Sequence, residues 1–185
     1  MPNITDLHVQ GERKPKIEEV IPEYLDGDMK KMALEFAAWM CENKMPLKWA
    51  GIHNAWKALY KGKVICYVRL YNDTWKNSGH LKNVYSKHLW VITPHLFEFD
   101  NYTDIVMSEG MQDFIWDNVH YCMFCRTPCH GKPPGKDVVI LGKEIKSVCW
   151  GRQLTWAFDP DKTEIEILKR LFELEQQARI GNSKK

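Results

Sequence analysis

The chain has 185 residues, of which 44% are hydrophobic and 27% are charged, and its formal net charge at pH 7 is +2. This length fits one domain, and these proportions are globular, which excludes a disordered chain, a collagen-like chain and a coiled coil. A near-neutral charge gives no reason to expect wholesale binding to DNA or to an anionic membrane. The unusual feature is an aromatic content of 12%, which includes eight Trp.

We expect residues 1–16 to be a flexible N-terminal arm, because they are polar and include two Pro. Residues 17–181 are expected to form a single domain and residues 182–185 a disordered tail. The apolar region of a signal peptide and an 18-residue apolar run are both missing from the sequence. These features favour a cytoplasmic protein without membrane contact.

The first half of the domain predicts helices followed by strands. Residues 17–25 predict a helical turn that Pro22 breaks. Residues 28–43 predict a helix with Asp26 or Asp28 as its N-cap, and its apolar stripe consists of Met29, Met32, Ala33, Phe36, Ala37 and Met40.

Three strands are predicted next, at residues 54–60, 63–71 and 88–95. Lys61 and Gly62 are expected to form a hairpin turn between the first two strands. Residues 72–87 are polar and predict a long loop before the third strand.

The second half of the domain predicts a helix at 103–117, capped by Thr103 and divided at Gly110. Strands are expected at 137–141, 144–149 and 152–158. A final helix should begin with a capping box of Thr163 and Glu166 and stop at Gly181. This order predicts an α+β fold: an antiparallel sheet with helices packed on one face and a Cys-rich, metal-stapled segment.

Four of the six Cys lie close together, as Cys122-x2-Cys125-x3-Cys129 followed by Cys149. In a reducing compartment such Cys favour metal ligation over disulfides, and four thiolates would form a closed structural zinc site. Within segment 119–151, the intervening run PCHGKPPGKD is rich in Pro and Gly and has little apolar content to bury. The sequence therefore predicts one structural zinc per chain, with these four Cys as ligands.

Other interpretations of these Cys stay open. Cys122 and Cys125 are also compatible with a redox pair, although the following Arg-Thr-Pro does not resemble a helix start. An iron–sulfur cluster or no metal at all are further alternatives, and His130 or His120 would serve as a ligand in place of one Cys. The remaining Cys41 and Cys66 are expected to be small buried hydrophobes.

The aromatic residues suggest a binding site. Most Trp are expected in the core, but Trp49, Trp56, Tyr67 and Trp90 come from neighbouring predicted strands. They predict an aromatic-lined pocket for a small molecule or peptide, because such sites are concave and mostly apolar.

Signals of catalysis or nucleic-acid binding are weaker. The common catalytic motifs are missing, which leaves His53 and His95 as candidates for acid–base chemistry. Residues 120–152 carry six basic side chains against two acidic ones. This excess would suit nucleic acid, but it also offsets the negative charge of a zinc–thiolate centre.

The run PLKWAGIHNAWKALYKGKVICYVRL, followed by LWVITPHL, WDNVHYCMFC and VCWG, resembles small bacterial proteins classed as a domain of unknown function. The resemblance covers residues 17–180 and implies no catalytic residue. The layout is also similar to GyrI-like effector-binding domains, but fold alone does not fix function.

The sequence thus favours a zinc-stapled cytoplasmic binding domain with an aromatic-lined pocket for a small molecule or peptide. A zinc-dependent module for nucleic acid or protein, and an enzyme using His53 or His95, remain as alternatives.

Overall fold

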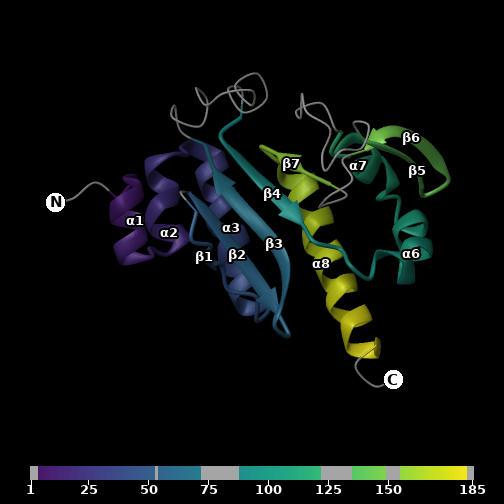
Figure 1. Cartoon of the computed structure of the whole chain (residues 1–185), viewed down its shortest axis with the longest axis horizontal. Helices are drawn as coiled ribbons and strands as arrows, with labels where there is room; N and C mark the ends of the chain where they lie inside the picture. Colours follow the sequence, from purple (N-terminus) through teal and green to yellow (C-terminus); the bar gives the residue numbers. More distant parts are fainter. Residues whose placement is uncertain (1–3, 53, 72–87, 122–134, 149–154, 183–185) are drawn as a thin grey trace.

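A computed structural model of the chain describes residues 4–52, 54–71, 88–121, 135–148 and 155–182. Its centre is a five-stranded antiparallel sheet in the order β1-β2-β3-β4-β7 (Figure 1). The strands are β1 (Lys48–Trp49), β2 (Ala55–Tyr60), β3 (Lys63–Leu70), β4 (Trp90–Pro94) and β7 (Ala157–Phe158). The expected 72–87 loop lies outside the described residues.

The β2–β3 hairpin forms where the sequence predicts it. Lys61 and Gly62 have φ angles of 47° and 78°, as a two-residue turn of this kind requires. Cys66 is fully buried on the face that packs against helices. Burial raises the pKa of its thiol to about 12, so Cys66 stays protonated and serves as a core residue.

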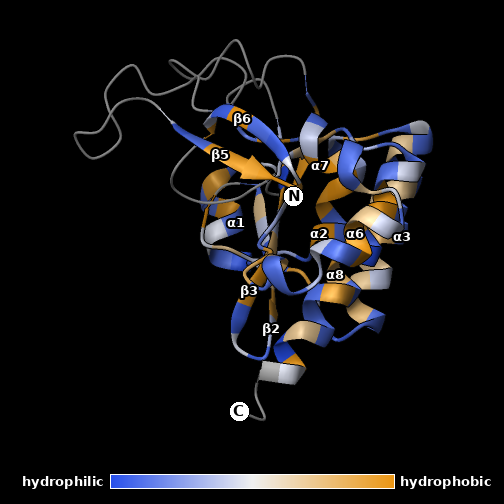
Figure 2. Ribbon diagram, turned by 90° about the vertical axis from the view of Figure 1, so that its right-hand side faces the viewer, coloured by the Kyte–Doolittle hydropathy of each residue, from blue (hydrophilic) through white to orange (hydrophobic). Residues whose placement is uncertain are grey.

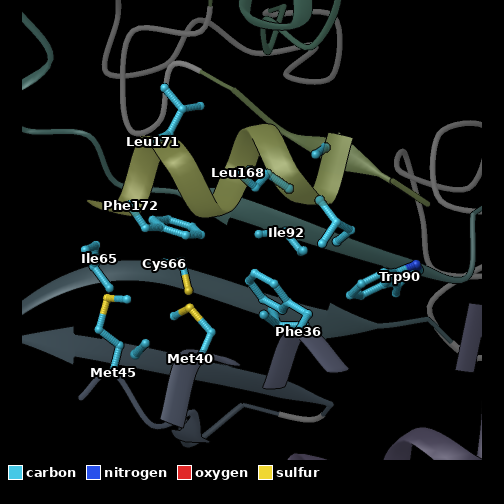
Figure 3. Close-up of a cluster of buried hydrophobic side chains, with 14 of the residues drawn as sticks. Phe36, Met40, Met45, Ile65, Cys66, Trp90, Ile92, Leu168, Leu171 and Phe172 are labelled. Atoms are coloured by element: carbon cyan, nitrogen blue, oxygen red, sulfur yellow. The ribbon is translucent and has the colours of Figure 1, made fainter. Parts of the chain in front are cut away.

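Two long helices, α3 (Gly27–Glu42) and α8 (Lys162–Asn182), lie on one side of this sheet (Figure 2). The fold is therefore α+β, with an antiparallel sheet. Phe36 and Met40 of α3 meet Leu168 and Phe172 of α8 and the inward side chains of the strands (Figure 3). This single apolar layer contains most of the buried hydrophobic residues and fixes the sheet against the helices.

Residues 99–117, which follow β4, are mostly helical, and the helical stretch is interrupted at Gly110 as predicted. A short 3-10 turn, η3 (Phe99–Asn101), precedes α6 (Thr103–Ser108) and α7 (Gln112–Asp117), and Gly110 separates these helices with a φ of 72°. Strands β5 (Lys136–Ile140) and β6 (Lys143–Val148) form a separate two-stranded sheet. No helix among the described residues has both the length and the apolar character needed to cross a membrane.

The structure corrects the expected flexible arm. Residues Leu7–Arg13 form helix α1, followed by α2 (Ile17–Val20) and the 3-10 turn η1 (Ile21–Glu23). The fully buried side chain of α1 is Gln10. Its amide N–H donates to the Asn54 side-chain oxygen at 2.6 Å, and its amide oxygen accepts the Asn54 backbone N–H at 2.9 Å. A polar residue thus anchors α1, so a search for apolar periodicity does not find this helix.

Three expected helix ends are also wrong. The reciprocal capping bonds of α8 join Asp161 and Glu164, at 3.0 Å and 2.9 Å, rather than Thr163 and Glu166. The helix begins earlier than predicted because Asp161 is an equally good cap residue. Thr103 is the first residue of α6 rather than its cap, and Gly181 lies inside the last turn of α8.

Candidate functional site

The four predicted zinc ligands, Cys122, Cys125, Cys129 and Cys149, lie outside the described residues, as do His53 and His130. Within the parts of the chain that the structure describes, no cluster of three or more His, Cys, Asp or Glu side chains is placed to hold a metal. The zinc site therefore remains a prediction.

The described residues that flank these Cys do meet in space. Val148, which precedes Cys149, pairs with both Tyr121, which precedes Cys122, and Lys136 at the start of β5. Gly135 lies against Ser147 so closely that a Cβ on it would come within 2.5 Å of the Ser147 backbone. Three flanking backbones thus converge at the end of β6.

Thr155, the first described residue after Val148, lies in the same region. It pairs with Val119, and the next amide, Trp156 N–H, donates to the carbonyl of Asn118 at 2.8 Å. His120 lies between these pairings, with its ring stacked on Trp156 at 4.0 Å between centroids. Burial lowers the pKa of His120 to about 4.

The four predicted pocket aromatics do not line one cavity. Trp56 and Trp90 are 0% and 1% exposed and belong to the core beneath the helices. Figure 3 shows Trp90 in this core. Tyr67 alternates with the core residues Cys66 and Val68 and therefore faces the other side of the sheet. Trp49 is the member of the set that reaches a pocket.

The pocket at Trp49 has a volume of about 510 Å³, within the range of roughly 300–1,000 Å³ typical of ligand sites. We call it the Trp49 pocket. Its walls come from the α1–α2 corner, the end of α3 and strand β1; the lining residues are Lys14, Pro15, Lys16, Glu18, Cys41, Pro46, Leu47, Lys48 and Trp49.

The α1–α2 corner has a defined local structure. Helix α1 ends at Lys14, which takes the left-handed conformation with a φ of 48° and donates its N–H to the Gln10 carbonyl. Pro15 then turns inward and is buried, and its carbonyl accepts the indole N–H of Trp56 at 2.9 Å. The core Trp56 thus holds the corner in place and leaves Lys14 and Lys16 exposed at the pocket.

The end of α3 supplies a second wall. Lys44 adopts a φ of 62°, and the Met45 N–H donates to the Met40 carbonyl at 2.8 Å, which is the pattern of a Schellman stop. Cys41, in the last turn, is exposed and lines the pocket, contrary to the expectation that it is buried. It follows directly after Met40 and so falls off the apolar stripe of the helix.

The Trp49 pocket is basic, and Trp49, which forms part of its wall, has a buried donor without an acceptor. Lys14, Lys16 and Lys48 form no ion pair with any residue that the structure describes, and Glu18 is the acidic residue of the lining. The Trp49 indole Nε1 is buried and has no hydrogen-bond partner in the described part of the chain. A buried donor left in this state costs about 1–3 kcal/mol, which an acceptor on a ligand would offset.

The opposite face of the sheet carries a second aromatic group. The Arg69 guanidinium lies 5.8 Å from the Tyr67 ring centre and 5.9 Å from that of Trp156. His95 packs between Tyr67 and Phe97, at 5.3 Å and 5.7 Å between ring centres. Burial, together with Arg179 and Arg69, lowers the pKa of His95 to about 4, so it is neutral at pH 7.

Sequence reasoning found Trp49 but missed the residues around it. Lys14, Lys16 and Lys48 each stand next to a Pro or Trp in Lys-Pro-Lys and Pro-Leu-Lys-Trp. That local signal was available, but their meeting at one pocket depends on the corner that Trp56 holds.

Comparison of this chain with family models, with curated proteins and with solved structures found no match.

Proposed function

We propose that this protein is a binding domain whose Trp49 pocket takes a small molecule or peptide with an anionic group. The observation that carries the proposal is a pocket of about 510 Å³ lined by three Lys and by Trp49. Among the described residues these Lys have no ion-pair partner, and the Trp49 indole N–H has no acceptor. Pro15, Leu47 and the Trp49 ring supply apolar surface, so a ligand with both a planar apolar part and a carboxylate or phosphate suits the site.

The experiment is a calorimetric titration of the full chain with 2-naphthoate, using the neutral 2-naphthamide as the matched ligand control. We expect saturable binding of the carboxylate and at least fivefold weaker binding of the amide. Trp49→Phe keeps an aromatic ring but removes the N–H, and it should weaken naphthoate binding several-fold. Equal binding of 2-naphthoate by the wild type and Trp49→Phe would contradict the proposed site.

The metal part of the proposal is a structural zinc held by Cys122, Cys125, Cys129 and Cys149. It is supported by the convergence of Tyr121, Gly135 and Val148 beside one another, because a tetrahedral site with four thiolate ligands needs its chain passes close together. A zinc there would fix the end of the β5–β6 sheet, whose exposed strands bury few side chains.

Metal analysis tests this part independently. We expect one zinc per chain, and removal by a chelator should speed amide hydrogen exchange in β5 and β6 much more than in β3 and β4. A matched pair of variants, Cys149→Ser and Cys41→Ser, separates a ligand from a free thiol: only the first should lose zinc. Retention of zinc in Cys149→Ser would remove Cys149 from the ligand set.

A further inference from the structure

Strand β1 forms one edge of the sheet, and its hydrogen-bonding pattern leaves Trp49 open. Trp49 stands opposite Trp56 and Lys48 stands opposite Lys57, and the next amide, Ala50 N–H, donates to the Ala55 carbonyl at 2.8 Å. In an antiparallel ladder, bonded and non-bonded pairs alternate. The Trp49–Trp56 pair is therefore the non-bonded one, and the Trp49 backbone N–H and C=O face away from β2.

Nothing among the described residues takes up these two backbone groups. The edge of a sheet with a free N–H and C=O is a template for another strand. The Trp49 pocket lies beside this residue and is walled by the α1–α2 corner, so an incoming strand would enter a bounded groove. Figure 1 shows α1 and α2 beside the β1 edge of the sheet.

The positive charges at this edge of the sheet favour an added strand that carries acidic side chains. Residues directly opposite each other share one face of a sheet, about 5 Å apart, and like charges there repel. Lys48 and Lys57 are such a pair. A strand added beside β1 would place one of its side chains next to Lys48, where an acidic side chain would relieve this repulsion, with Lys14 and Lys16 close to the same groove.

We propose that the occupant of the Trp49 pocket is an extended acidic peptide that pairs with β1. Its residue opposite Trp49 is apolar and packs toward Leu47 and Pro15, and its neighbour opposite Lys48 is Asp or Glu. Backbone pairing supplies affinity and the alternating side chains supply selectivity, as in other recognition by strand addition. This inference rests on the proposed function, since it names the ligand class of the same pocket.

The test uses the full chain and the acetylated, amidated peptide Glu-Val-Glu-Val-Glu. Two matched forms probe the pairing: one is N-methylated at both Val amides, which face β1 in the proposed register, and the other at the central Glu amide, which faces away from β1. We expect the first to lose at least tenfold in affinity and the second to change less than threefold. Exchange of the Trp49 amide should slow at least tenfold when the unmodified peptide is bound.

A Gln-Val-Gln-Val-Gln peptide and two protein variants test the charge. The neutral peptide should bind at least fivefold more weakly than the acidic one. Lys48→Gln should weaken binding of the acidic peptide several-fold at low salt, whereas Lys162→Gln, an exposed change on α8, should not. Equal binding of the two N-methylated peptides, or an unchanged Trp49 amide, would overturn strand addition. Binding of 2-naphthoate but of no peptide would overturn this inference alone, whereas failure of both ligands would overturn the proposed function as well.

Discussion

Two groups of polar side chains in this protein differ in how completely they are satisfied. The carboxylate of Glu175 in α8 is 0% exposed and accepts bonds from Arg179, Tyr102 and two backbone amides. Arg179 in turn donates to the carbonyls of Val64 and His95, both at 3.1 Å. In the Trp49 pocket, three Lys and an indole N–H lack such partners among the described residues.

This contrast separates a structural network from a binding site. Buried charges persist only when they are paired and hydrogen-bonded, and the Glu175–Arg179 pair meets that condition while it ties α8 to the strands β3 and β4. The hydrogen-bonding groups of this pair are therefore satisfied by partners inside the fold. The Trp49 pocket keeps three Lys ammonium groups without an ion pair among the described residues, as the proposed recognition of an external anion requires.

The largest expected effect is the loss of the buried pair. Glu175→Ala leaves Arg179 buried without its carboxylate and should lower the free energy of unfolding by about 3–5 kcal/mol, as measured by urea denaturation. Glu173→Ala is the control, because Glu173 is two residues away on α8 and bonds Arg170 at 3.3 Å near the surface. A difference between the two variants below about 1 kcal/mol would mean that the pair does not hold α8.

The Gln10–Asn54 contact is a neutral version of the same kind of network. Gln10→Ala leaves the buried amide N–H of Asn54 without its acceptor and should cost about 1–3 kcal/mol. Glu12→Ala, on the exposed side of α1, should stay within about 0.5 kcal/mol. If both variants unfold at the wild-type urea concentration, α1 is not anchored to β2 through this residue.

His95 predicts a pH dependence of stability. Its pKa falls from 6.5 to about 4 in the folded chain, so the unfolded state binds more protons between these values and stability is lost as pH falls through this window. Tyr67 and Phe97 contact the ring, and the charges of Arg179 and Arg69 act on it. Glu175 pairs with Arg179 and accepts the backbone N–H of Glu98. Part of the ring is exposed, so we expect the loss to be roughly 2 kcal/mol rather than the full linkage value.

His95→Gln measures this contribution by difference. The variant should lose less free energy of unfolding than the wild type between pH 7 and pH 4. His120 titrates in both proteins, so its contribution cancels in the difference. Parallel pH profiles for the two proteins would show that protonation of His95 is not what destabilises the fold.

The sequence predicted the sheet and helices where local pattern and tertiary packing agree. The alternation around Cys66 and the Lys61–Gly62 turn identified the hairpin, and Gly110 marked the break between α6 and α7. The same alternation places Tyr67 on the face opposite to Cys66, but a two-residue turn at Lys61–Gly62 would pair Tyr67 with Trp56 and put both on one face. A register shift between Ala58 and Leu59 pairs Trp56 with Val68 instead, and the local pattern does not show this shift.

Other features depend on contacts that no local pattern contains. Helix α1 is anchored by one buried Gln bonded to a residue 44 positions away. The Trp49 pocket depends on the Trp56 indole, which bonds Pro15 across 41 positions. Many pairs of polar residues in a chain could form such a hydrogen bond. The spacing of residues in the sequence therefore does not predict which distant pair does so.

The smallest expected effect on stability belongs to the pocket. A triple change to Gln at Lys14, Lys16 and Lys48 removes no bond that the described structure makes, and it ends the repulsion between Lys48 and Lys57. The free energy of unfolding should therefore stay within about 0.5 kcal/mol of wild type or rise slightly. Anion binding, measured on the same samples, should be abolished.

A second triple variant distinguishes this specific loss from a general loss of charge. It carries the same change in net charge at exposed positions far from the pocket, namely Lys61→Gln, Lys146→Gln and Lys162→Gln. Stability and 2-naphthoate affinity should both stay near wild type in this control. A pocket triple that unfolds more than about 1 kcal/mol more easily than the control would show that these Lys support the fold, and the contrast with Glu175 would then fail.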